Sequence, residues 1–339
     1  MFNQNNSLIK SEKQRGWVAR LVVLLVILAL GAAIYLNLTT ISDQVRAWMF
    51  HPSSAVASLD SQLDLTPTAQ RIFYASTPSI EGASTLDKTC PQLEVGNPIL
   101  GCYAGGAIHI YNITNQQLAG IQQVTAAHEL LHAIWERLPQ SERNSLGTLL
   151  MAEYKKLNDP ELESRMDYYQ REEPGEMTNE LHSILGTEYP NLGSELESHY
   201  AKYFKNRAKI VSYNSQYKSV FNNLNSQVSS MQADLNQELT NINTAEVQYQ
   251  KDLATLTSDI NDFNRRANNG YFTSESQFQS ERASLVKRSN QLDAEAANIN
   301  AQVDDYNSKL TTYNQLLNKL KGLNDSLQRI PSVEGAPSV

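Results

Sequence analysis

The longest regular pattern of hydrophobic positions lies in the C-terminal half of the chain. Between Glu195 and Ala267 the sequence contains neither proline nor glycine, and apolar or aromatic residues recur at seven-residue intervals. The series consists of Phe221, Val228, Leu235, Ile242, Tyr249, Leu256 and Phe263. Heptad repeats sustained over this length are typical of coiled-coil helices.

A second series with the same spacing follows, and the segment Asn268-Asn269-Gly270-Tyr271 between the two predicts a turn. The second series consists of Leu285, Leu292, Ile299, Tyr306, Tyr313, Leu320 and Leu327, with Val303, Leu310 and Leu317 beside it. We therefore expect an antiparallel coiled-coil hairpin over residues 201–330, with arms of about 80 Å, and a disordered tail over residues 331–339. Such a hairpin could be a spacer, a site of self-association or substrate capture, or the binding site of a protein partner.

A continuous rather than periodic run of hydrophobic residues lies near the N-terminus. From Val18 to Leu38 the only charged residue is Arg20, and a helix of this length spans a hydrocarbon layer of about 30 Å. Several basic residues precede the run, whereas Asp43 and Arg46 follow it. The positive-inside rule therefore predicts a single-pass transmembrane helix over residues 18–38, with residues 1–17 cytoplasmic and the bulk of the chain extracytoplasmic. A cleaved signal peptide is the alternative, because small residues lie within the run.

Shorter, mixed patterns fill the segment between these two regions. Residues 39–65 are polar and indicate a linker, and Thr66 before a proline is typical of a helix start. Residues 107–113 alternate between apolar and polar side chains, which predicts a strand. A long helix over about residues 119–138 and several shorter helices are expected to follow it. This order predicts an α+β domain over residues 66–200, mostly helical and with a short β-sheet.

The balance of charge excludes one large class of function. The chain carries 28 Lys and Arg against 36 Asp and Glu, a formal net charge of −8, and residues 51–200 hold 20 acidic against 8 basic side chains. Nucleic-acid binders show the opposite bias, because they neutralise phosphates with a basic surface. We therefore expect no nucleic-acid partner.

The two cysteines of the chain are Cys90 and Cys102. Both lie in the part assigned outside the membrane, where disulfide bonds persist. Half of a metal site is the other interpretation, but neither a C-x-x-C spacing nor a nearby histidine supports it. We expect a disulfide bond that closes a short loop.

The clearest chemical signal is the pattern H-E-x-x-H at His128, Glu129 and His132. No proline or glycine interrupts this segment, so we expect a helix, and residues four apart share one face of a helix. The two imidazoles can then bind one metal ion, and zinc suits such a pair. Glu129, next to the first ligand, can accept a proton from an attacking water. The alternative is a helix that carries these three residues at this spacing by chance.

The residues around the motif resemble those of a known family. Thr125 stands three positions before the first histidine, Ile134 stands two positions after the second, and both internal positions are uncharged. This segment is similar to the extended pattern of the zincin metallopeptidases. A second segment, N-E-L-H-S over residues 179–183, resembles the N-E-x-x-S segment of thermolysin-type gluzincins, although Ile184 stands where that pattern has an acidic residue.

The resemblance implies a small zincin-like catalytic domain that holds Zn2+ and hydrolyses peptide bonds. It implies that the ligands are His128, His132 and Glu180, with Glu129 as the general base. The alternatives for the third ligand are Glu176, His182 and Glu188. The choice of a residue that stabilises the oxyanion stays open among His182, Tyr189, His199 and Tyr200.

These expectations combine into a membrane-anchored, extracytoplasmic zinc metallopeptidase that acts on a peptide or protein substrate. In zincins an edge strand beside the active-site helix pairs with the substrate backbone, and the strand over residues 108–113 is the candidate for that role. Two other functions remain open. One is a structural or adhesive coiled-coil protein of the cell surface with a non-catalytic metal-binding domain, and the other is a hydrolase of non-peptide amides.

Overall fold

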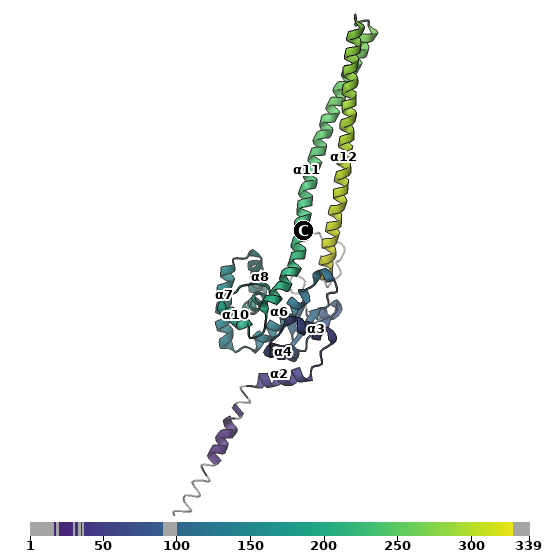
Figure 1. The fold of residues 1–339 in the computed structure, drawn as a ribbon. Helices are drawn as coiled ribbons and strands as arrows, with labels where there is room; N and C mark the ends of the chain where they lie inside the picture. Colours follow the sequence, from purple (N-terminus) through teal and green to yellow (C-terminus); the bar gives the residue numbers. More distant parts are fainter. Residues whose placement is uncertain are drawn as a thin grey trace, which may run out of the picture. The chain divides into compact units, whose positions relative to one another are not determined.

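The computed structural model describes residues 17, 20–29, 31, 32, 35, 37–90 and 100–327. Over these residues the chain is mostly helical and contains one three-stranded sheet (Figure 1), which confirms the expected α+β class. The chain divides into two compact units. The first consists of Met1–Tyr217 with Ser326–Val339, and the second of Lys218–Asp325.

The sheet of the first unit is formed by β1 (Ser79–Glu81), β2 (Gly101–Ala104) and β3 (Ala107–Tyr111), in the order β1-β3-β2. β1 runs parallel to β3, and β2 runs antiparallel to it. Gly105 and Gly106 form the turn between β2 and β3 with φ of 59° and 79°. Two consecutive residues with positive φ are typical of the tight hairpin turn, which glycine adopts without strain.

The expected strand after residue 107 is thus present as β3, but its expected position at the edge of the sheet is wrong. Ser79 to Glu81 pair with one side of β3 and Gly101 to Ala104 with the other. Both rows of backbone groups of β3 are therefore used inside the sheet, and none is available to a peptide strand. In the described part of the chain, the strand that has a free edge and contacts the helix of the H-E-x-x-H motif is β2.

Along the chain, helices precede and follow the strands of this sheet. Thr66 starts one of them as expected, because its hydroxyl oxygen accepts a hydrogen bond from the Ala69 N–H at 3.3 Å. The helical segments of the first unit are α2 (Leu38–Met49), α3 (Ser54–Leu63), α4 (Pro67–Ala75), α5 (Ala83–Thr89), η1 (Gln116–Leu118), α6 (Ile121–Arg137), α7 (Gln140–Leu157), α8 (Pro160–Glu172), α9 (Met177–Glu188) and α10 (Ser194–Tyr200).

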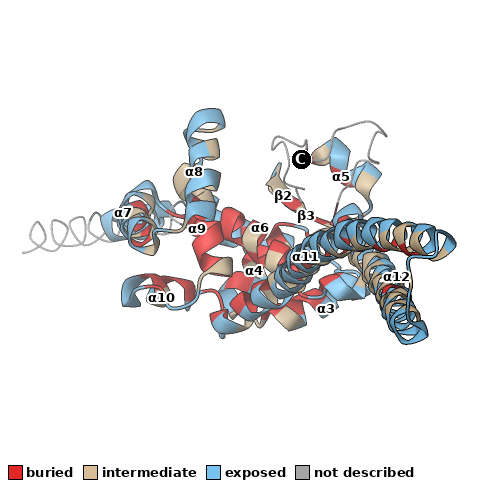
Figure 2. Cartoon of the chain, turned by 90° about the horizontal axis from the view of Figure 1, so that it is seen from above, coloured by how far each residue is buried: buried red, intermediate tan, exposed pale blue. Residues whose placement is uncertain are grey.

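The core of the first unit is centred on α6, which is buried along most of its length (Figure 2). α6 packs against α9 and against the face of the sheet that carries Ile108 and Ile110, both fully buried. The contact with α9 is close, because a Cβ atom on Gly186 would lie 2.5 Å from Leu131 Cδ1. This close packing brings the polar residues of α9 up to α6.

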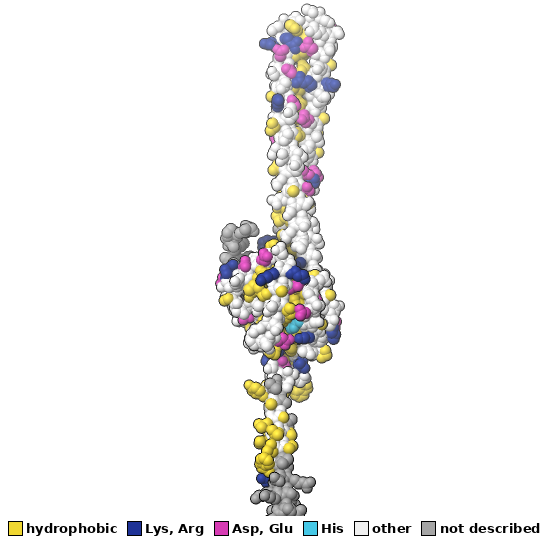
Figure 3. All heavy atoms as spheres, turned by 90° about the vertical axis from the view of Figure 1, so that its left-hand side faces the viewer, with side chains coloured by type: hydrophobic (Ala, Val, Ile, Leu, Met, Phe, Trp, Pro, Cys, Tyr) yellow, Lys and Arg dark blue, Asp and Glu magenta, His cyan; other side chains and the backbone are white. Residues whose placement is uncertain are grey.

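The expected membrane anchor is not supported. No helix within the described residues is long and apolar enough to cross a membrane. This finding contradicts the predicted single-pass topology and the predicted location that was derived from it. The apolar side chains of residues 21–28 are largely exposed (yellow in Figure 3). The helix that follows, α2, carries Asp43, which is buried against the fold. Residues 1–16, several residues of the run over 18–38, and the expected tail over 331–339 lie outside the described part.

The expected disulfide bond between Cys90 and Cys102 is present, with their Cα atoms 5.8 Å apart. Cys90 follows directly after α5, and Cys102 lies in β2. The bond therefore ties β2 to the end of α5, in addition to the backbone hydrogen bonds that hold β2 in the sheet.

The second unit contains most of the two long helices α11 (Arg207–Asn268) and α12 (Glu275–Leu327). They lie side by side and run in opposite directions (Figure 1), and the expected turn is present at Gly270, with φ of 67°. Leu235, Leu256 and Leu292, which belong to the two heptad series, are buried between the helices.

Candidate metal centre

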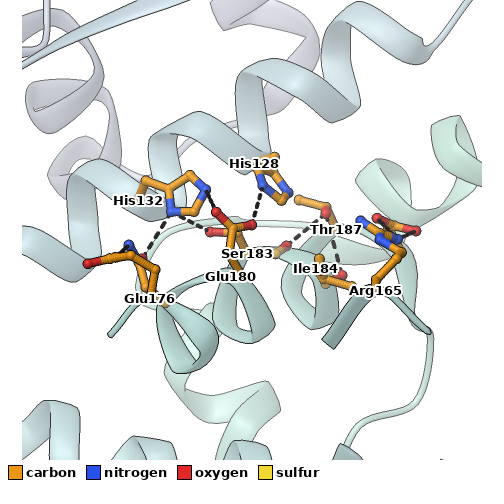
Figure 4. A network of polar contacts seen from close by, with 10 residues as sticks. His128, His132, Arg165, Glu176, Glu180, Ser183, Ile184 and Thr187 are labelled. Atoms are coloured by element: carbon orange, nitrogen blue, oxygen red, sulfur yellow. Dashed lines mark hydrogen bonds and ion pairs between the residues drawn. The ribbon is translucent and has the colours of Figure 1, made fainter. Parts of the chain in front are cut away.

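The helix α6 presents both histidines of the H-E-x-x-H motif on one face, as residues four apart must be. The ring centroids of His128 and His132 lie 4.8 Å apart, with the rings at 73° to each other. Both side chains point toward α9 (Figure 4). The face of α6 that carries the two imidazoles therefore meets the helix that carries Glu180.

Glu180, in the first turn of α9, lies between the two imidazoles (Figure 4). Its Oε2 is 3.5 Å from His128 Nε2, and its Oε1 is 3.4 Å from His132 Nε2. One ligand atom from each of these three residues lies within 4.8 Å of the other two. The fold thus brings Glu180 beside two histidines that are distant from it in the sequence.

The chemistry of these three ligand residues fits a divalent cation such as zinc. In a tetrahedral zinc site with bonds of about 2.0–2.1 Å, neighbouring ligand atoms are about 3.3–3.4 Å apart. Glu180 approaches His128 at 3.5 Å and His132 at 3.4 Å through different carboxylate oxygens. With one ligand atom from each residue, the three atoms lie within 4.8 Å of one another, so they are spread more widely than a bound zinc ion would hold them. Two imidazole nitrogens and one carboxylate also leave a fourth position of the tetrahedron free, which is the arrangement of catalytic zinc sites.

Hydrogen bonds at the far side of His132 orient its ring. Asn179 Nδ2 donates to Glu176 Oε2 at 2.8 Å, so Asn179 Oδ1 faces His132 Nδ1 at 2.9 Å. An amide oxygen can only accept, so Nδ1 carries the proton and Nε2 keeps its lone pair for the cluster. Partners of this kind fix the tautomer of metal-binding histidines. Ser183 Oγ lies 3.4 Å from the same Nδ1.

Electrostatics keep Glu180 in its charged form. Burial by itself raises the pKa of a carboxyl group. When His132 and His128 are protonated, their positive charge outweighs this effect, and together with the Arg165 guanidinium it lowers the pKa of Glu180 to about 2. A carboxylate that stays ionised is the form that binds a cation.

Glu129 lies next to this cluster but does not belong to it. Only 6% of its surface is exposed, and burial raises its pKa to about 7. His132 and a backbone hydrogen bond from Tyr103 oppose this rise, whereas the charge of Glu180 adds to it. A carboxylate with such a pKa is able both to accept and to return a proton near neutral pH.

β2 lies beside Glu129, because a Cβ atom on Gly101 would lie 3.2 Å from Glu129 Cγ. Gly101 makes this close approach possible, because a Cβ atom there would lie 2.6 Å from Thr125 Cγ2 and 2.7 Å from the carbonyl oxygen of His109. Any larger residue would push the strand away from α6. The free edge of β2 therefore runs past the buried carboxylate.

The three alternatives to Glu180 as third ligand lie outside the cluster. Glu176 binds the Asn179 amide, and Glu188 forms an ion pair with Arg165 at 2.9 Å. His182 is fully buried, and its Nε2 lies 2.9 Å from His199 Nε2. Burial is the largest cause that lowers the pKa of His182 well below its usual value, and the charge of His199 adds to it.

The residues considered as oxyanion stabilisers are engaged elsewhere in the unit. The Tyr189 hydroxyl donates to Asp159 Oδ2 at 2.7 Å, and the Tyr200 hydroxyl donates to the carbonyl oxygen of His182 at 2.8 Å. His182 and His199 bind each other. Two polar groups near the site were not predicted from the sequence: the Asn179 amide beside His132 and the Tyr103 backbone beside Glu129. Asn179 does belong to the N-E-x-x-S segment, which was the available signal.

Three comparisons were made with known proteins. Neither a scan of protein families, nor a search of curated proteins, nor a search of solved structures found a match to this chain.

Proposed function

We propose that this chain is a zinc-dependent peptidase whose active site is built on α6 and α9. One observation supports this most strongly: His128, His132 and Glu180 converge with ligand atoms within 4.8 Å of one another, and the buried Glu129 lies beside them. A cluster of this composition with an adjacent carboxylate of raised pKa is typical of a hydrolytic site.

The three ligands would hold the ion, and the ion would supply Lewis acidity to the carbonyl and to water. Glu129 would take a proton from the attacking water and return it to the leaving amine. Burial, which raises its pKa, favours acceptance of that proton. Asn179 would keep His132 in the tautomer that presents Nε2 to the ion.

The position of β2 favours a peptide as the substrate. β2 lies at the edge of the sheet and contacts α6, and the backbone of Tyr103 reaches Glu129. An extended peptide that adds to this edge by main-chain hydrogen bonds would pass the catalytic carboxylate. The role first assigned to residues 108–113 thus moves to Gly101–Ala104.

The finer descriptions of the two units belong to the same proposal. The first unit would be a zincin-like domain, because its metal ligands come from an H-E-x-x-H helix and a following helix. The α11–α12 pair would be an antiparallel coiled coil, because its apolar residues repeat every seven positions and members of both series are buried between the helices.

The test measures bound zinc and the cleavage of a peptide library for the wild-type chain and for the Glu129→Gln variant. We expect equal zinc in the two proteins and cleavage by the wild type alone, because Gln keeps the shape of the side chain but cannot accept the proton. Stoichiometric zinc in both proteins without cleavage that depends on Glu129 would contradict the peptidase assignment and leave a metal-binding protein.

A further inference from the structure

The strand β2 is short and pairs with a neighbour along one side only. It has four residues, Gly101–Ala104, and lies at the edge of the sheet beside β3. A strand of this length with one neighbour is held by few backbone hydrogen bonds, so it opens easily unless other contacts fix it. The contacts that the side chains of β2 make therefore decide how well ordered its free edge is.

The hydrogen bonds of the β2–β3 pair show which backbone groups face the free edge. The Tyr111 N–H donates to the carbonyl oxygen of Leu100 at 2.7 Å. In an antiparallel pair, hydrogen-bonded and non-hydrogen-bonded positions alternate. The register Cys102↔His109 is therefore a hydrogen-bonded position, and the backbone groups on either side of it, at residues 101 and 103, point away from β3.

The first of these two residues, Gly101, lies directly against α6. A Cβ atom on Gly101 would lie 2.6 Å from Thr125 Cγ2 and 3.2 Å from Glu129 Cγ. The backbone of Tyr103 also reaches Glu129. An extended peptide at this edge would thus meet the backbone groups of Gly101 and the Tyr103 carbonyl oxygen, beside Glu129.

Cys102 fixes β2 from the face of the sheet that points away from α6. Successive side chains of a strand alternate between the two faces, so the Cys102 side chain lies on the opposite face from that of Tyr103. Its disulfide bond reaches Cys90 at the end of α5, and α5 contacts β3. The bond therefore ties β2 to a helix that packs on the neighbouring strand.

Tyr103 fixes β2 to α6 through its hydroxyl group. The hydroxyl donates to the Glu136 carboxylate and accepts from Arg137 Nη1 at 3.2 Å. Arg137 is itself held in place, because Nη1 also donates to the Ala133 carbonyl oxygen at 2.7 Å. In addition, Nε and Nη2 of Arg137 bind the Asp43 carboxylate at 2.8 and 2.9 Å. The strand is thus attached to a side chain that cannot follow it if it moves.

We propose that Cys102 and Tyr103 are positioning residues that keep the free edge of β2 ordered for pairing with an extended peptide. Three consecutive residues of this edge strand are each fixed to α5 or α6, one by close packing, one by a disulfide bond and one by hydrogen bonds. An edge that is ordered before the peptide arrives loses less binding free energy to ordering. This inference rests on the proposed function, since it assigns both residues a role in binding the proposed substrate.

The test compares Tyr103→Phe and the double variant Cys90→Ser/Cys102→Ser with the wild type in cleavage of one library peptide. We expect KM to rise about three- to tenfold for Tyr103→Phe and at least about tenfold for the double variant, with kcat changed by less than about twofold. A smaller folded fraction alone would lower the apparent kcat and leave KM as it is. The matched control is Tyr111→Phe, on β3 and on the other face of the sheet, which should leave KM unchanged.

Binding without turnover separates this inference from the proposed function. In chains that also carry Glu129→Gln, the fluorescence anisotropy of labelled library peptides gives Kd, which should rise by the same factors. Amide hydrogen exchange over residues 101–104 should quicken in both variants. A wild type that cleaves nothing refutes the peptidase assignment but leaves the comparison of Kd intact. The positioning role is overturned if no peptide binds, if neither variant raises Kd, or if kcat falls at constant KM.

Discussion

The amide of Asn179 determines which nitrogen of His132 is free to bind a metal ion. It accepts from His132 Nδ1 at 2.9 Å and is itself held by Glu176. A neutral imidazole has one proton for two nitrogens, so a fixed acceptor at Nδ1 leaves the lone pair on Nε2. Asn179 would therefore support metal binding without itself being a ligand.

We expect Asn179→Ala to weaken zinc binding by about 10- to 100-fold, as loss of a hydrogen-bond partner of a metal-binding histidine typically does. Competition with a chromophoric chelator measures the affinity directly. Ser183→Ala is the matched control. Ser183 Oγ lies further from the same nitrogen, at 3.4 Å, so its replacement should weaken zinc binding less. An Asn179→Ala variant that binds zinc as tightly as the wild type would show that the tautomer is set by something else.

The residues of the site differ in how far the sequence could predict them. His128, Glu129 and His132 belong to one helical turn, so their relative positions follow from the geometry of the helix. Glu180 could be named through a resemblance, but its distances to the imidazoles depend on how α9 packs against α6. The contact between Asn179 and His132 spans 47 residues, and no local pattern encodes it.

A largely buried ion pair joins α2 to α6. Arg137, at the end of α6, donates from Nε and Nη2 to the two carboxylate oxygens of Asp43, at 2.8 and 2.9 Å. Its Nη1 reaches the Tyr103 hydroxyl at 3.2 Å. The ion pair thus joins α2 to α6 and to β2, and both of its side chains are largely buried.

We expect Asp43→Ala to destabilise the first unit by about 3–5 kcal/mol, because it leaves the Arg137 charge buried without its partner. Urea unfolding followed by circular dichroism gives the change in the free energy of unfolding. Arg46→Ala is the control, because Arg46 makes an exposed hydrogen bond to the Gly106 carbonyl oxygen at 3.3 Å and should change stability by less than about 0.5 kcal/mol. Equal losses in the two variants would contradict the special role of the buried pair.

The helices and strands themselves were easier to predict than the elements that each of them pairs or packs with. The alternation of β3 and the helical character of α6 and α11 are local properties of the sequence, and the structure contains all three. The position of β3 inside the sheet was missed because β1 is only three residues long, Ser79–Glu81, which is too short to show an alternating pattern. Its parallel pairing with β3 depends on the fold and changes which strand is free to bind a peptide.

At the scale of the whole molecule, the hydrophobic pattern predicted the two long helices and the turn between them but misjudged the N-terminal run. The heptad repeat indicates a helix face that packs against a partner, and members of both series, such as Leu256 and Leu292, are buried. A continuous apolar run reports hydrophobicity alone. In the described residues, α2 begins at Leu38 after a turn at Asn37 and carries the buried Asp43, and no helix there is long and apolar enough to cross a membrane.

The central claim is that two histidines of α6 and one glutamate of α9 form a single zinc site. The most direct measurement is the zinc content per chain after dialysis, for the wild type, Glu180→Gln and Glu188→Gln. We expect one zinc per chain in the wild type and in Glu188→Gln, whose side chain pairs with Arg165 outside the cluster, and little zinc in Glu180→Gln. A wild-type chain without zinc, or a Glu180→Gln variant that keeps zinc as well as the wild type does, would contradict the claim.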